Sequence, residues 1–260
     1  MLSDIQLTNY ILTFILMLTR MSGLFVISPV FGFRNLPMQL KLFMAAGASF
    51  ILFLTHPPSA TEPIANSMWT LAVMGGTEFF IGFCIGFAAE LVFTGVRMSG
   101  EYLSVQMGMS VASILDPITG NQSPLMGQIF YLFAFLLLMS LNLHHVFIIA
   151  VDKSLQFIPL GMPIDSLGIL TERMLVMASD MFIIALQIAA PAMAILLVTE
   201  VALAFVAKVM PQMNIFIVSL PLKFAIGLMG IMASMPFLAK FLINHYTKLG
   251  EHLFGLFNNL

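Results

Sequence analysis

Seven charged side chains interrupt long apolar segments of this 260-residue chain, and they are the residues best placed to do chemistry. A charged residue inside an apolar helix is costly, so each is expected to line a pathway, to pair inside a bundle or to form an interface salt bridge. Pairing is the interpretation that we favour, and a carboxylate relay in a transporter is the alternative. The seven residues are Arg20, Glu78, Glu90, Arg97, Glu101, Asp180 and Glu200.

Three of these charges fall at helical spacing. Arg97 lies seven residues after Glu90 and four residues before Glu101. Residues at such separations share one helix face, so these three are expected to neutralise one another or a common neighbour. A transporter would instead use Glu78, Glu90 and Asp180 as its relay.

A stretch of mixed polarity in the middle of the chain, residues 106–122, is the second candidate site. It reads as a loop, because Asp116-Pro117 fits the first two positions of a type I turn. Irregular backbone in an apolar protein must be buried in protein or line water. Its candidate residues are Gln106, Met107, Gly108, Met109, Ser110, Ile114, Leu115, Asp116, Pro117, Gly120, Asn121 and Gln122.

Within this loop, Met107 and Met109 flank Gly108. Methionine side chains are unbranched and adaptable, so the two could form a deformable apolar collar that closes a pore and yields to a passing chain. We expect Gly108 and Gly120 to act as hinges. Ile114 and Leu115 are expected to extend the apolar seal.

The sequence contains none of the familiar catalytic or nucleotide-binding motifs. Neither phosphate-binding glycine pattern occurs, and there is no His-Glu-x-x-His zinc motif and no Gly-x-Ser-x-Gly nucleophile elbow. His144 and His145 are adjacent rather than spaced for a shared metal ion. The single cysteine, Cys84, allows no disulfide within the chain. We therefore expect no enzyme activity, no metal and no cofactor.

The composition excludes an ordinary soluble domain. Only 8% of the residues are charged and 60% are apolar, whereas soluble proteins are about 25% charged. A surface of that composition needs lipid or partner protein around it. The net charge of −2 lacks the basic patch of a nucleic-acid binder, so nucleic acid is excluded as a main partner.

The apolar segments predict an all-α protein with long helices. The third helix is too long for a simple membrane span, since about 20 residues suffice. Six crossings would put the termini on one side and Arg34, Lys41, Arg97 and Lys208 on the other, although charges inside the spans fit this poorly. The expected helices cover residues 10–33, with a bend or stop at Pro29, then 41–54, 67–103, 124–150, 174–207 and 214–247. The polar stretch 152–173 is the expected main boundary.

Pairs of small residues four apart occur on two of these helices. Gly82 and Gly86 form one pair, and Ala185/Ala189 and Ala190/Ala194 repeat the spacing. Such pairs let helix backbones approach closely, although they also occur by chance in apolar helices.

Three separated stretches resemble the FliR family of flagellar and type III secretion export components. They are Arg20 to Arg34 with Pro37 and Lys41, then Gln106 to Gly120 followed by Leu141 to His145 and Ile158 to Gly161, and finally Ala190 to Phe216 with Leu220 to Lys223. The resemblance covers nearly the whole chain in the family's order. Glu200 and Ala204 depart from it, since a different polar residue and a glycine are expected there.

The resemblance implies a non-enzymatic subunit of an export gate. One FliR joins several FliP and FliQ copies, with FlhB/FlhA-type export proteins nearby, and unfolded flagellar proteins pass through. Residues 1–165 would be a FliP-like part and residues 166–260 a FliQ-like hairpin, and the loop at 106–122 would be the pore plug. The complex would lie at the bacterial inner membrane in the flagellar basal body, projecting partly to the periplasmic side. The alternatives are the equivalent subunit of a virulence injectisome, a solute or ion transporter, and an intramembrane enzyme.

Overall fold

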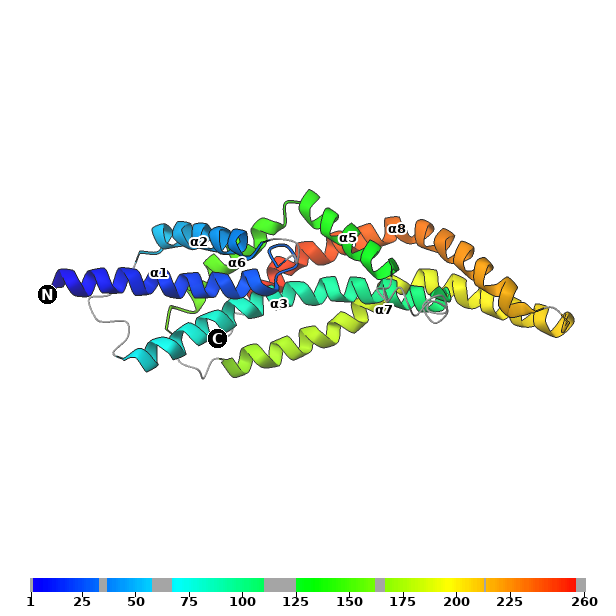
Figure 1. Ribbon diagram of the computed structural model, residues 1–260, viewed down its shortest axis with the longest axis horizontal. Coiled ribbons are helices and arrows are strands. Elements are labelled where there is room, and N and C mark those ends of the chain that lie inside the picture. The colour runs from blue at the N-terminus through cyan, green and yellow to red at the C-terminus, as the bar shows by residue number, and fades with distance from the viewer. Residues whose placement is uncertain are drawn as a thin grey trace. The chain divides into compact units, whose positions relative to one another are not determined.

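A computed structural model describes residues 2–32, 37–57, 67–109, 125–161, 167–212 and 214–255. All the regular structure in these ranges is helical, which confirms the all-α fold class. Figure 1 shows the helices in chain order. They are α1 (Leu2–Ile27), α2 (Met38–Thr55), α3 (Met68–Gln106), α5 (Leu125–Ser140), α6 (His144–Phe157), α7 (Leu167–Val209) and α8 (Ile215–Gly255).

Five of these helices are long and apolar enough to cross a membrane, and the count becomes six if the bent pair α5 and α6 forms one span. This agrees with the apolar composition and with a membrane location. At about 1.5 Å per residue, the 43 residues of α7 rise about 65 Å, roughly twice the hydrocarbon thickness of a bilayer. The helices α3 and α8 are nearly as long, at 39 and 41 residues.

The first helix ends where proline was expected to stop it. α1 ends at Ile27, two residues before Pro29, and the chain turns through Gly32, whose N–H donates to Ser28 O at 2.7 Å. Proline disfavours helical backbone in the residue before it, which accounts for this end. The ammonium of Lys41, on α2, donates to Gly32 O at 3.0 Å and so ties α2 to the turn.

The single helix expected from residue 124 to residue 150 is wrong, because the chain breaks into α5 and α6, bent by 71°. Asn142 adopts a left-handed φ of 56°. The N–H of Asn142 donates to Met139 O at 3.0 Å and that of Leu143 donates to Leu138 O at 3.2 Å. These two bonds make a Schellman motif with asparagine in the place usually taken by glycine.

The chain divides into two compact units that interleave along the sequence. Unit 1 comprises residues 1–91, 138–178 and 246–260, and unit 2 comprises residues 92–137 and 179–245. The helices α3, α7 and α8 each contribute residues to both units. The division into a FliP-like part, residues 1–165, and a FliQ-like hairpin, residues 166–260, stays a prediction.

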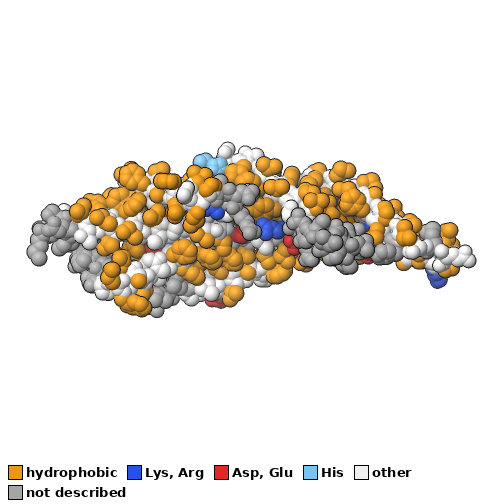
Figure 2. Space-filling model, in the orientation of Figure 1, with side chains coloured by type: hydrophobic (Ala, Val, Ile, Leu, Met, Phe, Trp, Pro, Cys, Tyr) orange, Lys and Arg blue, Asp and Glu red, His pale blue; other side chains and the backbone are white. Residues whose placement is uncertain are grey.

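Apolar side chains cover much of the described surface, as the orange atoms of Figure 2 show for one face. The helices α7 and α8 carry many of them. Large apolar patches of this kind mark surfaces that meet lipid or protein. The exposed apolar residues on α7 in unit 2 include Phe182, Ile183, Leu186, Leu197, Val198, Val201, Phe205 and Val209, and those on α8 include Ile217, Met229, Met232 and Phe237.

Candidate functional site

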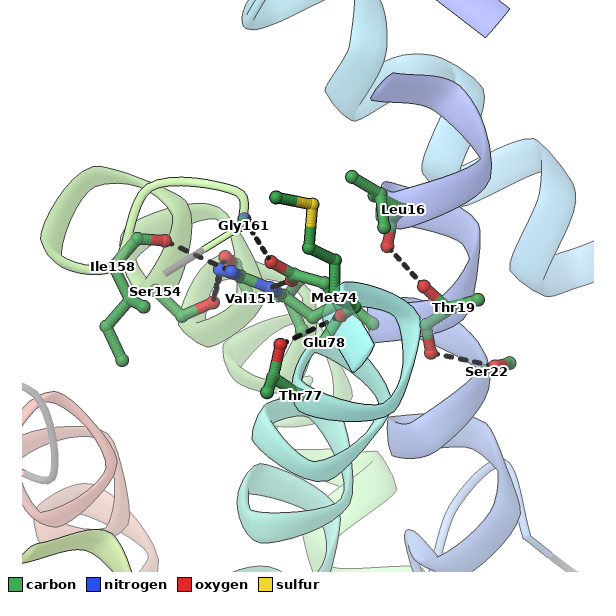
Figure 3. A network of polar contacts seen from close by, with 11 residues as sticks. Leu16, Thr19, Ser22, Met74, Thr77, Glu78, Val151, Ser154, Ile158 and Gly161 are labelled. Atoms are coloured by element: carbon green, nitrogen blue, oxygen red, sulfur yellow. Dashed lines mark hydrogen bonds and ion pairs between the residues drawn. The ribbon is translucent and has the colours of Figure 1, made fainter. Parts of the chain in front are cut away.

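A fully buried ion pair lies within unit 1. Arg20 on α1 and Glu78 on α3 both have no solvent exposure, and the Arg20 Nε–H donates to Glu78 Oε2. The other two guanidinium nitrogens donate to Ser154 Oγ and to Ile158 O, each at 3.0 Å. Figure 3 shows the partners Glu78, Ser154 and Ile158 gathered in one network of polar contacts. One arginine therefore joins α1, α3, α6 and the turn that follows α6.

Both carboxylate oxygens of Glu78 accept hydrogen bonds. Its second oxygen, Oε1, accepts a hydrogen bond from the Gly161 N–H at 3.0 Å. Gly161 has a φ of +82°, and a Cβ there would lie 3.2 Å from Met74 Cε, so glycine suits the position in both backbone and space. The turn at 158–161 is thus bound at both of its ends, at Ile158 by Arg20 and at Gly161 by Glu78. Figure 3 shows Ile158, Gly161 and Glu78 in this arrangement.

Close helix packing brings the pair together. A Cβ added to Gly82 on α3 would overlap Arg20 O, and one added to Gly23 on α1 would overlap Phe79 O. At Gly86 an added Cβ would lie 2.6 Å from Ile27 Cγ2. The predicted role of Gly82 and Gly86 in close helix approach is therefore confirmed. The pair Ala185/Ala189 is buried on α7, whereas Ala190 and Ala194 are exposed.

The central loop begins at the end of α3, within unit 2. Gln106 ends the helix, and the N–H groups of Met107 and Gly108 donate to Leu103 O at 2.9 Å and to Val105 O at 3.0 Å. Gly108 has a φ of +77°, which L side chains rarely adopt, so the backbone turns at the predicted hinge. The loop residues Ser110, Ile114, Leu115, Asp116, Pro117, Gly120, Asn121 and Gln122 lie outside the described residues.

The start of the loop packs against α8. Met107 is only 1% exposed, whereas Gln106 and Met109 are half-buried. A Cβ added to Gly227 on α8 would lie 2.6 Å from Met107 Cγ and 2.9 Å from its Sδ. A Cβ added to Gly108 would lie 2.6 Å from Leu220 Cδ2. Met107 thus fills a notch on α8, and its role in a pore collar stays a prediction.

A second ion pair joins α7 to α8 beside this notch. Lys223 Nζ donates to Glu200 Oε1 at 2.6 Å, and both side chains are partly exposed. Lys223 follows Leu220 by three residues and precedes Gly227 by four, so all three lie on one face of α8. Sequence reasoning left Lys223 and Gly227 out of the site, although Lys223 is the only charge between residues 214 and 239.

Arg97 and Glu101, on the second half of α3, face α5. A Cβ added to Gly127 would lie 3.1 Å from Glu101 Cγ and 3.4 Å from Arg97 Cγ, which confirms that Arg97 and Glu101 share a helix face. The Arg97 guanidinium carbon lies 4.6 Å from the ring centre of Tyr131, a cation–π contact. Glu90 is half-buried and Asp180 is exposed.

For Arg20 and Glu78, pairing was the favoured interpretation of the sequence, and the two satisfy each other inside unit 1. Glu78 is therefore poorly placed to serve in an ion relay. Within the described ranges no cluster of three His, Cys, Asp or Glu residues could hold a metal ion.

Comparison with known proteins gives a family match over residues 11–249, to the model described as bacterial export proteins, family 1. The chain is 35% identical to the flagellar biosynthetic protein FliR of Bacillus subtilis over 224 residues, 85% of each chain. It is 29% identical to FliR of Escherichia coli, over 94% of this chain and 88% of the relative. It is also 27% identical to the Yop proteins translocation protein T of Yersinia pestis, over 84% of this chain and 83% of the relative.

Proposed function

Because the chain belongs to the bacterial export proteins, family 1, we propose that it is a structural and gating subunit of a flagellar type III protein export channel. The observation that carries this proposal is the match to flagellar biosynthetic proteins over nearly the whole length of the chain. The substrates would be unfolded flagellar proteins. The chain would act without a cofactor, as a part of the channel rather than as an enzyme.

The proposed partners are FliP and FliQ homologues, with one copy of this chain among several of each and FlhA/FlhB-type proteins nearby. The long apolar faces of α7 and α8 support this assembly, because they extend beyond what a bilayer covers. The proposed location is the bacterial inner membrane at the flagellar basal body. Part of the complex would project to the periplasmic side, which accommodates helices too long for the membrane.

The loop at residues 106–122 is the proposed plug. Gly108 supports this role because its left-handed backbone gives the loop a turn at its start. Deletion of residues 106–122 should make the assembled pore leak small ions, and replacement of both Met107 and Met109 by alanine should cause a smaller leak. Ion flux into vesicles holding the complex is the measurement. A deletion complex as tight as the wild type would contradict the gating role.

Native mass spectrometry tests the assembly. The chain is expressed with and without FliP and FliQ homologues, purified in mild detergent and weighed. A single copy within a defined hetero-oligomer is the expected result. A stable monomer or homo-oligomer that ignores those partners would instead favour a transporter, for which Asp180 and Glu90 would be the carboxylates to study.

The second candidate is the same role in a virulence injectisome. The similarity to the Yop proteins translocation protein T supports it, although at lower identity than the flagellar relatives. Deletion of the encoding gene, followed by assays of motility and of effector secretion, distinguishes the flagellar role from the injectisome role. Loss of motility with intact effector secretion would support the flagellar role, and the reverse would support the injectisome role.

A further inference from the structure

The Met107 side chain packs into the notch on α8 that the missing side chain of Gly227 leaves. All three Met107 atoms beyond Cβ lie close to the place that a Gly227 side chain would occupy, with Cγ at 2.6 Å, Sδ at 2.9 Å and Cε at 3.0 Å. Even one methyl group at Gly227 would displace the methionine. A side chain at position 227 and Met107 in its present position therefore exclude each other, and Met107 is buried there, being 1% exposed.

Two further contacts of α8 lie next to the notch, one with the loop and one with α7. Leu220, about two turns before Gly227 on α8, lies against Gly108, where the loop backbone turns. Lys223, between them on the same face, is bonded to Glu200 on α7. The ion pair thus fixes α7 to α8 at the level where the loop begins, and the hairpin presents a preset surface to Met107.

We propose that Met107 and Gly227 form a latch, through which α8 holds the start of the central loop in its resting position and which must open during export. This inference rests on the proposed gating role of the loop. It assigns a positioning function to Gly227, Leu220 and the Glu200–Lys223 pair, all of which belong to the C-terminal hairpin. Displacement of the loop then requires Met107 to leave the notch.

The geometry allows the latch to be closed covalently. With Cγ 2.6 Å from the Gly227 Cβ position and a C–C bond of about 1.5 Å, the two Cβ atoms are at most about 4.1 Å apart. Disulfides join Cβ atoms about 3.5–4.5 Å apart. In the double variant Met107→Cys/Gly227→Cys, the methionine that would obstruct a new side chain at position 227 is also gone.

To test the latch, the double variant is expressed in cells that contain the complete export complex, and an oxidant is added. A disulfide should form, substrate secretion should fall at least tenfold, and a reductant should restore it. The two single-cysteine variants and the wild-type chain, oxidised in the same way, are the controls. Failure of the disulfide to form in the assembled complex would overturn the contact, and undiminished secretion with the disulfide formed would overturn the opening step.

A second set of variants needs no disulfide. Gly227→Ala should push Met107 out of the notch and raise ion leak through the complex severalfold, while Met107→Ala/Gly227→Ala should return the leak toward that of Met107→Ala alone. Gly76→Ala is the matched control, because no atom lies within 4 Å of the added Cβ. Equal leaks in Gly227→Ala and Gly76→Ala would contradict the latch. A tight pore after deletion of the whole loop would refute the gating role itself, whatever the disulfide does.

Discussion

The Arg20 and Glu78 side chains form a buried ion pair whose polar atoms also bind Ser154, the Ile158 carbonyl and the Gly161 N–H. A buried ion pair contributes little net stability when compared with well-packed apolar residues, but the loss of one partner strands a charge. The two residues are therefore best understood as a junction that holds a specific turn to three helices.

Replacement of Arg20 by methionine should destabilise the chain by about 3–5 kcal/mol, because Glu78 is left charged and unpaired in the core. Ser154→Ala should cost less, about 1.5–3 kcal/mol, since it removes one hydrogen bond to a charged group. The melting temperature of the purified chain in detergent measures both. If Arg20→Met melts no lower than Ser154→Ala, the pair is not the junction described.

Sequence could identify Arg20 and Glu78 as candidates but could not pair them. The pattern of one charge in an apolar helix marks each residue, yet 58 residues separate the two and no local spacing connects them. Their remaining partners are backbone groups of Ile158 and Gly161, which carry no side-chain signature, and the hydroxyl of Ser154. The placement of Arg97 and Glu101 on one face was predictable, because residues four apart in a helix are neighbours.

At the scale of helices, the glycines of α3 set how closely α1 packs. Gly82→Ala should prevent the folded chain from accumulating, because the new Cβ would overlap the Arg20 carbonyl and backbone atoms cannot rotate away. Gly76→Ala, on the same helix with open space around it, should be neutral or stabilising by up to about 1 kcal/mol. The amount of protease-resistant chain in membranes is the measurement. Similar amounts of both variants would show that the helices can separate at Gly82 without loss.

The end of the first helix was predictable to within a few residues because Pro29 marks it. The break at Asn142 was missed because the apolar run continues through it and asparagine signals a left-handed cap more weakly than glycine. α7 begins earlier than expected because Glu172 is exposed on the helix surface while Leu170 and Met174, four apart, are buried. A polar cluster was thus mistaken for a loop.

At the scale of the whole molecule, the main difficulty for sequence reasoning is that long helices serve more than one compact unit. α3 contributes residues 68–91 to unit 1 and residues 92–106 to unit 2, and α7 also divides between them. The two compact units therefore have no single boundary along the sequence. The central loop begins in unit 2, so the helices that position it come from both halves of the sequence.

The exposed face of α7 predicts that protein, rather than lipid alone, covers this chain. Phe182 and Val209 are 51% and 79% exposed, and the helix between them rises about 40 Å. At the average tilt of about 20° that face still spans about 38 Å, more than the ~30 Å hydrocarbon core. A bilayer would thus leave one end of the apolar face in water.

Spin labels at Phe182→Cys and Val209→Cys, introduced one at a time, distinguish the two kinds of cover. Cys84 is 1% exposed and should stay unlabelled, which the wild-type chain checks. Both labels should be mobile in the isolated chain and immobilised once the partner subunits are added, because partner side chains then pack on both ends of the face. A label at either end that stays mobile in the assembled complex would mean that this end of α7 meets lipid or water, and the proposed assembly would need a different surface.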